Sequence, residues 1–187
     1  MKKSFINTIP LLLSPVCLAV LVFAPVSRAF SGDFLVTNIF VDATTSQDGD
    51  GPLNGSNYIY FDFNDQDTPQ LPTVTCLIYW PSSQNPAIDN IALCANDSVR
   101  VAISANTPSS TSLSAFSPEN FGIDLQHTYL DNSVGQAPYN VLTKFGGLNL
   151  SWPGTEGYDC ENNDGEGGLC WSRTGTAYLA VVTRAIS

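Results

Sequence analysis

Histidine chemistry rests on a single residue, because His127 is the only histidine in the chain. A Ser-His-Asp triad would need it as the base, and the many serines and aspartates make chance pairings easy. The sequence contains no G-x-S-x-G nucleophile elbow. His127 alternates with Phe121, Ile123, Leu125 and Tyr129, which favours a hydrogen-bonded histidine on a half-buried strand.

Paired carboxylates offer a second chemistry, because two suitably spaced acids can hydrolyse a glycosidic bond. A catalytic acid needs an apolar pocket that raises its pKa. Only Asp62 falls in an expected strand, whereas the other candidates fall in turn-like segments, where acids are solvated. We therefore expect no catalytic residue, and we keep a carbohydrate-active enzyme as a second alternative function. Its candidate acids are Asp62, Asp65, Asp67, Asp159, Glu161, Asp164 and Glu166.

The same acids place oxygen atoms at alternate positions, as a calcium site would require. The two candidate segments are Asp159 to Asp164 and Asp48 to Asp50. Neither matches the twelve-residue calcium loop with its central glycine and terminal glutamate. The pattern therefore favours a solvated acidic loop over residues 159–166, and we expect no metal and no cofactor.

Three tryptophans, Trp80, Trp152 and Trp171, could form a stacking platform for a sugar or a phenol. Each of them follows a strand-like run or a cysteine. Packing against a disulfide or a barrel end is the commoner use of such residues, so we expect packing.

The first 29 residues have the pattern of a secretory signal peptide. Lys2 and Lys3 precede an apolar stretch from Ile9 to Val26, and the cut is expected after Ala29. Prolines interrupt this stretch, whereas a membrane helix needs about 20 consecutive apolar residues. We expect a secreted, extracellular protein that is free of the membrane after cleavage, with residues 30–187 as one domain.

Removal of residues 1–29 makes the chain more acidic. All 17 acidic residues follow residue 29 but three of the seven basic residues precede it, so the net charge changes from −10 to −13. Such a surface repels nucleic acid and anionic membranes, because it offers no cationic patch that would release counterions. It is compatible with a basic protein partner, with cations or simply with solubility.

Four cysteines follow residue 29: Cys76, Cys94, Cys160 and Cys170. An even number in a secreted chain implies two disulfides, for which three pairings exist. By loop entropy, a disulfide would stabilise the fold by about 3 kcal/mol for each short loop and by about 4.6 kcal/mol for a Cys76–Cys160 link. Loop entropy therefore cannot decide between the three pairings. Short loops close faster, which favours the sequential pairing. No C-x-x-C motif supports a zinc ribbon or a thioredoxin-type site.

Eight short segments have the composition of β-strands, and none shows a helical period. In the first, Leu35, Ile39 and Val41 are expected on one face; in the seventh, Gly146-Gly147 is expected to introduce a bulge or a hairpin. The spacing predicts an all-β fold, a small antiparallel β-barrel or sandwich with two disulfides. The segments are Phe34–Asp42, Tyr58–Phe63, Thr73–Trp80, Ile91–Cys94, Val99–Ile103, Phe121–Tyr129, Tyr139–Trp152 and Ala177–Val182.

Asparagine-linked glycosylation sequons occur at Asn54, Asn96 and Asn149. The first two lie in expected turns, which suits a surface glycan, whereas Asn149 lies in an expected strand. If the protein is secreted by a eukaryotic cell, we expect it to be a glycoprotein.

Three stretches of the chain carry a recognisable pattern. TVTC contains Cys76, LCANDSVRVAI carries a Cys-x-x-x-Ser segment from Cys94 to Ser98, and YDC…LCWSRTGTAYLAVV carries the Cys160–Cys170 loop and the closing strand Ala177–Val182. Together these features resemble the Alternaria major allergen family of ascomycete fungi. In order and spacing these features cover almost the whole chain after residue 29.

The resemblance implies a small secreted β-barrel with the pairing Cys76–Cys94 and Cys160–Cys170. Members of the family are allergens, elicitors of plant defence, or binders of host defence proteins and small phenolic ligands. The family archetype joins two subunits through a further cysteine near the mature N-terminus. No cysteine lies between Phe30 and Thr75 here, so we expect a monomer or a non-covalent dimer.

The expected function is therefore binding without catalysis, by a secreted fungal effector- or allergen-like protein that binds a host protein or a ligand; the partners that the resemblance implies are a host defence protein or a small phenolic ligand. The first alternative is a barrel that binds a small flavonoid or phenolic ligand.

Overall fold

The computed structural model describes residues 32–43, 56–82, 84–88, 90–104, 116–162 and 168–187. The expected signal peptide, Asn54 and the acids at 48, 50, 164 and 166 lie outside these residues. The described residues form no helix, and so none that is long and apolar enough to cross a membrane. They form ten strands: β1 (Phe34–Asp42), β2 (Ser56–Asp65), β3 (Val74–Pro81), β4 (Ala92–Leu93), β5 (Val99–Ser104), β6 (Asn120–Leu130), β7 (Val141–Ser151), β8 (Tyr158–Asn162), β9 (Gly168–Ser172) and β10 (Ala177–Ile186).

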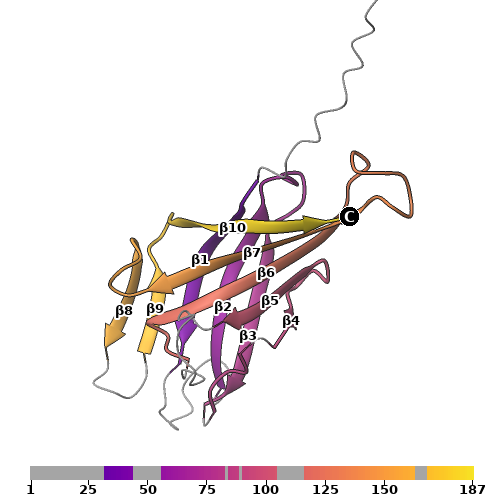
Figure 1. Cartoon of the computed structure of the whole chain (residues 1–187). Helices are drawn as coiled ribbons and strands as arrows, with labels where there is room; N and C mark the ends of the chain where they lie inside the picture. Colours follow the sequence, from indigo (N-terminus) through magenta and orange to yellow (C-terminus); the bar gives the residue numbers. More distant parts are fainter. Residues whose placement is uncertain (1–31, 44–55, 83, 89, 105–115, 163–167) are drawn as a thin grey trace, which may run out of the picture.

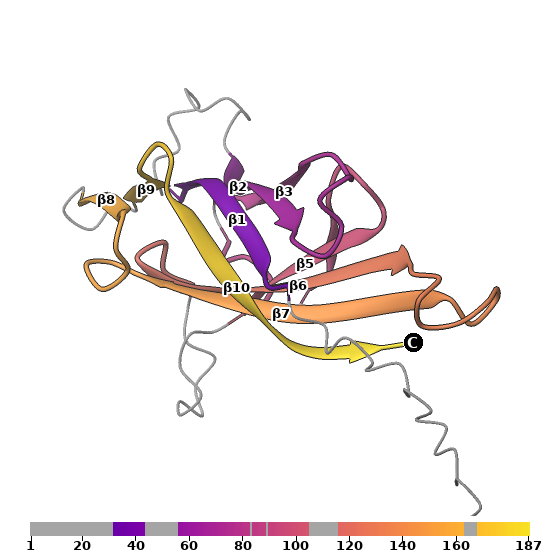
Figure 2. The same ribbon diagram turned by 90° about the horizontal axis from the view of Figure 1, so that it is seen from above.

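The strands form one antiparallel sheet that curls into a nearly closed barrel, which confirms the expected fold. The order is β3-β2-β1-β10-β7-β6-β5-β4, and the β8–β9 hairpin joins the sheet through β9 and β1. Figures 1 and 2 show β10 crossing from the β1–β2–β3 side to the β5–β6–β7 side. β10 achieves this by pairing with β1 along its first half and with β7 along its second half.

A seam remains between β3 and β4, the two strands at the ends of this order. The Cys76–Cys94 disulfide spans it, and the Ala95 amide donates to the Thr75 carbonyl at 2.9 Å. The second disulfide joins Cys160 and Cys170, which face each other across the β8–β9 hairpin. Both pairings are sequential, as expected.

Alternating burial along the strands fills the barrel. On β2, Ile59, Phe61 and Phe63 are buried while Tyr58 and Tyr60 face outward, as the alternation predicts. Burying one face of each strand in this way fixes the register, because a slip by one residue would expose the whole apolar set.

The expected face of β1 is wrong at Leu35. Phe34 and Val36 are buried before Asn38, whereas Ile39 and Val41 are buried after it, so the alternation changes phase. Asn38 has a φ of 53°, and the register with β2 shifts there. Asparagine tolerates this left-handed conformation better than most residues, and a bulge adds one residue to the strand.

The glycine pair does not break β7 into a hairpin, because β7 runs without interruption from Val141 to Ser151. The register shift between β7 and β10 lies on β10, between Val182 and Arg184. Gly146 is needed for close packing. A Cβ there would lie 2.9 Å from the Val181 carbonyl oxygen and 3.0 Å from the Phe34 ring. The closing strand also runs beyond its expected end, because its second half pairs with β7.

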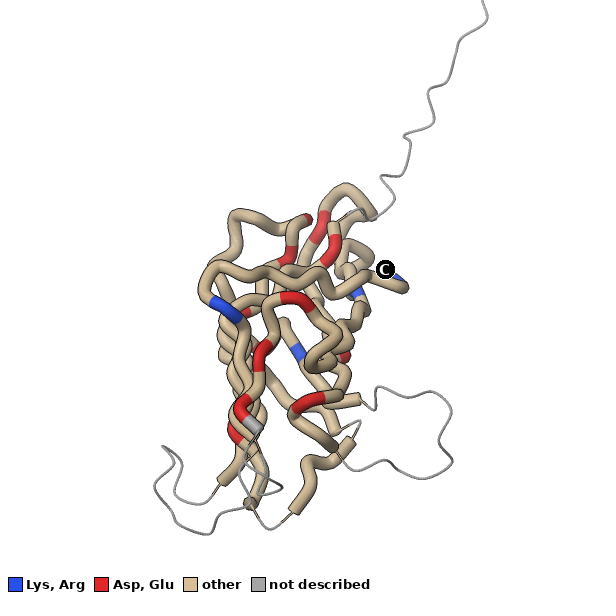
Figure 3. Tube along the Cα trace, turned by 90° about the vertical axis from the view of Figure 1, so that its left-hand side faces the viewer, with Lys and Arg blue, Asp and Glu red and all other residues tan. Residues whose placement is uncertain are grey.

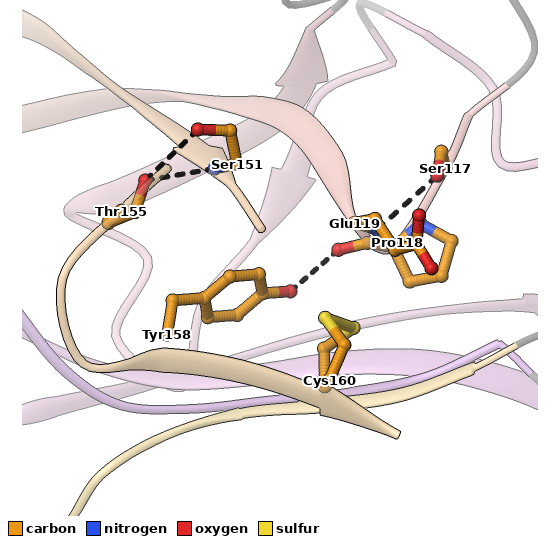
Figure 4. The surroundings of a disulfide bond; sticks show 8 residues. Ser117, Pro118, Glu119, Ser151, Thr155, Tyr158 and Cys160 are labelled. Atoms are coloured by element: carbon orange, nitrogen blue, oxygen red, sulfur yellow. Dashed lines mark hydrogen bonds between the residues drawn. A yellow bond between two sulfur atoms is a disulfide. The ribbon is translucent and has the colours of Figure 1, made fainter. Parts of the chain in front are cut away.

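The segment expected as an acidic loop, residues 159–166, begins in strand, since residues 159–162 belong to β8. Its remainder lies outside the described residues, and β9 follows it. Figure 4 shows Tyr158 of the β8–β9 hairpin directed toward Pro118, which lies shortly before β6. The Tyr158 hydroxyl beside the disulfide donates to the Pro118 carbonyl at 2.7 Å. The Tyr158 ring also packs edge-on against Phe121. The Cys160–Cys170 disulfide therefore stabilises a hairpin whose Tyr158 ring packs against the barrel core.

Candidate functional site

A cluster of ionisable side chains lies inside the barrel, at the end where β1 begins and β2 ends. Asp65 and Lys144 have fully buried side chains, and His127 is 2% exposed. Asp65 continues the inward face of β2 one step beyond Phe63, and Lys144 follows Leu142 on the inward face of β7. We call Asp65, Asp67, His127 and Lys144 the ion cluster.

The Lys144 ammonium makes three hydrogen bonds, as many as it has protons. Nζ donates to the Gly32 carbonyl at 2.7 Å, to Asp65 Oδ1 at 2.7 Å and to Asp67 Oδ2 at 2.8 Å. It also lies 5.0 Å from the centroid of the Phe34 ring. A buried ammonium is tolerated only when it is paired in this way.

The other oxygen of Asp65 holds His127, whose Nδ1 lies 2.8 Å from Oδ2. Burial alone would raise the pKa of Asp65, but hydrogen bonds from His127, Lys144 and the Asp67 amide, with the charge of Lys144, hold this pKa below its ordinary value. His127 is hydrogen-bonded on an inward-facing strand, as expected. The cluster links β2, β6, β7 and the segment before β1, so its geometry fits a structural lock.

Acid should remove the contribution of Asp65 to stability. A carboxyl group whose pKa is lower in the folded chain stabilises the fold above its ordinary pKa, and this contribution is lost as pH falls through the folded value. We expect the free energy of unfolding to fall below about pH 4, with this proton contributing up to about 1.4 kcal/mol per pH unit.

Urea unfolding at a series of pH values measures this slope, and Asp65→Asn provides the comparison. The pKa of Asp131 is also lowered, by hydrogen bonds from Ser133, but this affects both proteins equally. The variant should lack part of the wild-type slope. Equal slopes in the two proteins would show that Asp65 is not the titrating group.

The outside of the barrel carries an aromatic surface on β1, β2, β3 and β9. Phe40 lies opposite Tyr60 on one side and opposite Trp171 on the other, and Tyr60 in turn lies opposite Leu77. Directly opposed residues share a face of the sheet, so they form one row. A second row pairs Tyr58 with Tyr79. We call these six residues the outer aromatic face: Phe40, Tyr58, Tyr60, Leu77, Tyr79 and Trp171.

This face is accessible and partly preorganised. Tyr79 is 70% exposed and Leu77 41% exposed, and the other four residues are half-buried. The rings of Phe40 and Tyr58 stack with centroids 5.8 Å apart and an interplanar angle of 25°. Aromatic side chains that present large, rigid surfaces are enriched at binding interfaces.

Acidic residues occupy outward positions in the same rows. Asp42 lies opposite Tyr58, and Asp159 lies opposite Trp171. Burial raises the pKa of Tyr58, and the charge of Asp42 raises it further; burial and the charge of Asp62 raise the pKa of Tyr60 in the same way. Figure 3, seen from the β8–β9 side of the barrel, shows more acidic than basic positions along the tube.

The structure separates the three tryptophans. Trp80 is buried and packs edge-on against Phe116, and Trp152 packs against the core, as expected. Trp171 is half-buried on the outer aromatic face, so the three do not form one platform.

Two sequons lie within the described residues, and both asparagines are exposed. Asn96 is in a turn, where its Oδ1 accepts a hydrogen bond from the Ser98 amide at 2.9 Å. Asn149 lies near the end of β7.

The expected assignment to turns is right for Asp67 and wrong for Asp65, Asp159 and Glu161, whereas Asp164 and Glu166 lie outside the described residues. Asp65 ends β2 with its side chain inward, whereas Asp159 and Glu161 lie on β8. Asp62 accepts hydrogen bonds from Asn38 and Thr75, and Asp159 pairs with Arg173 at 2.7 and 3.0 Å. These contacts distribute the candidate acids between the ion cluster and the barrel surface.

Lys144 was missed as a site residue, although a signal for it exists. Extending the β2 alternation past Phe63 places Asp65 inward, and a buried carboxylate requires a partner. Only four basic residues follow residue 29, so few partners were available. The outer aromatic face could not be found in this way, because it depends on which strands are neighbours.

A scan against protein-family models finds no family whose model matches this chain. A search of curated proteins likewise finds no match.

Proposed function

We propose that this chain is a secreted effector- or allergen-like protein that binds a host defence protein through its outer aromatic face and catalyses no reaction. The observation that carries the proposal is the face itself, five rings and a leucine gathered from four strands on the outside of the barrel. Apolar residues this concentrated on a surface mark an interaction site more often than chance exposure. The two disulfides are compatible with an extracellular location.

The interior offers less support for a ligand site than the surface does. At one end Trp80, Phe116, Phe121 and Tyr158 pack ring against ring. At the other end the side chains of the ion cluster are hydrogen-bonded to one another. A planar phenolic ligand would therefore find its stacking surface outside, on the Phe40–Tyr58 pair, which makes it the alternative occupant of the same face.

The test captures partners from plant apoplastic fluid with the mature chain, then purifies the retained protein and measures its affinity by calorimetry. The variant Tyr58→Ala/Tyr60→Ala removes two rings of the face. The matched control Leu130→Ala/Tyr139→Ala removes apolar side chains that are 72% and 79% exposed outside the face. We expect binding to weaken at least about tenfold in the first variant and to stay unchanged in the control, because central aromatic residues dominate interface energies.

A partner that binds both variants like the wild type would contradict the proposal, and so would the absence of any partner across several hosts. A flavonoid that quenches Trp171 fluorescence in the wild type but not in a Trp171→Phe variant, with no protein retained, would favour the small-ligand alternative.

A further inference from the structure

We infer that the partner surface received by the outer aromatic face is a cationic segment, a stretch of chain that presents lysine or arginine side chains. This inference rests on the proposed function and adds the chemistry of the partner. It starts from the charge of the strands that build the face. β1, β2, β3, β8 and β9 contain no lysine, arginine or histidine. The acids at their outward positions are Asp42, Asp62 and Glu161, together with Asp159, which is already paired with Arg173.

Rings and carboxylates alternate closely on this surface. Neighbouring strands lie about 4.8 Å apart, so a carboxylate opposite a ring is within reach of any cation placed over that ring. Asp42 lies opposite Tyr58, and the Tyr60 hydroxyl donates a hydrogen bond to Asp62 Oδ1 at 3.4 Å, so these carboxylates lie beside the rings. A cation over the rings would gain from both the ring faces and the carboxylates.

The barrel already makes both interactions within its own chain. On the outer side of β7 and β10, the Arg184 guanidinium lies 4.2 Å from the centroid of the Phe145 ring. At the border of the face, Arg173 forms a two-bond pair with Asp159, at 2.7 and 3.0 Å. The outer surface thus accommodates guanidinium groups over rings and beside carboxylates. A cationic segment would repeat these contacts at Phe40, Tyr58 and Tyr60.

An acidic or neutral partner segment fits the face less well. Like charges placed together across an interface lower affinity and slow association, whereas complementary charges speed it. Residues 30–187 carry a net charge of −13, which attracts a cationic partner over a longer range and speeds its association.

The probe for this inference is hexa-arginine, with hexa-glutamine as the neutral control of equal length. Calorimetry at low salt should detect binding of hexa-arginine but not of hexa-glutamine. Binding should weaken at least about tenfold in 1 M NaCl, where the screening length is about 3 Å. Equal binding of both peptides, no binding of hexa-arginine, or a salt-independent affinity would overturn the inference.

Variants locate the binding. Tyr58→Ala/Tyr60→Ala should weaken hexa-arginine binding about 5- to 30-fold, because each ring contributes a modest cation–π interaction. Tyr58→Phe/Tyr60→Phe keeps the rings and should bind like the wild type. Asp42→Asn should weaken binding severalfold, and Leu130→Ala/Tyr139→Ala should have no effect. Far-ultraviolet circular dichroism checks that each variant is folded.

Equal affinities in the wild type and in the folded Tyr58→Ala/Tyr60→Ala variant would mean that the peptide binds elsewhere, and the inference would then be wrong. The two proposals also fail differently. If a purified host protein depends on the face but hexa-arginine does not bind, only the partner chemistry is wrong. If neither depends on the face, the proposed function is wrong as well.

Discussion

Replacing Asp65 with asparagine should lower the free energy of unfolding by about 3–5 kcal/mol, the usual cost of breaking a buried ion pair by removing one partner. Asparagine has the same shape, so the change removes the charge and one acceptor site. The Lys144 ammonium would keep the Gly32 carbonyl and Asp67, but the charge beside His127 would be lost. Since the total free energy of unfolding of a small domain is only about 5–15 kcal/mol, the variant should unfold at a much lower urea concentration than the wild type.

The matched control is Asp159→Asn, which removes the same charge from an exposed pair. The Arg173 and Asp159 side chains are 66% and 32% exposed. An exposed, solvent-screened pair contributes little to stability, so the free energy of unfolding of this variant should stay close to that of the wild type. Losses of similar size in the two variants would show that the ion cluster does not lock the barrel.

The double variant Cys76→Ala/Cys94→Ala should lose about 3 kcal/mol, the value that chain entropy gives for a separation of 18 residues. Its structural effect should be larger than that of Cys160→Ala/Cys170→Ala. No strand ladder joins β3 to β4 across the seam, whereas Cys160 and Cys170 are already opposite each other in a ladder.

Hydrogen exchange separates the two disulfides. The Ala95 amide, which donates across the seam to Thr75, should exchange much faster in the first double variant than in the second. Unchanged protection of Ala95 after loss of Cys76–Cys94 would mean that the barrel closes without this disulfide.

The sequence predicted the strands that bury one face. β2 and β6 follow the expected alternation, because aromatic and branched residues at every second position leave only one way to bury them. The phase of β1 was predicted wrongly, since a bulge at Asn38 depends on a backbone conformation that asparagine permits but does not require. Cysteine spacing favoured the observed pairing without deciding it.

The candidate site was less predictable for a physical reason. The outer aromatic face brings together residues from 40 to 171, and only strand neighbourhood places Phe40 between Tyr60 and Trp171. Local alternation shows that Tyr58 and Tyr60 point outward, but not what lies beside them. The ion cluster is hard to predict for another reason. The charge of Asp65 favours a turn in the sequence, whereas in the structure Asp65 is the last residue of β2.

The most direct test of the central claim is to map the partner on the barrel by amide nuclear magnetic resonance, titrating the captured host protein into isotope-labelled mature chain. The account predicts that the largest changes lie on β1, β2, β3 and β9, around Phe40, Tyr58, Tyr60 and Trp171, with little change at the 131–140 segment. Changes concentrated at that segment or on β4 and β5, with these four residues unaffected, would contradict it.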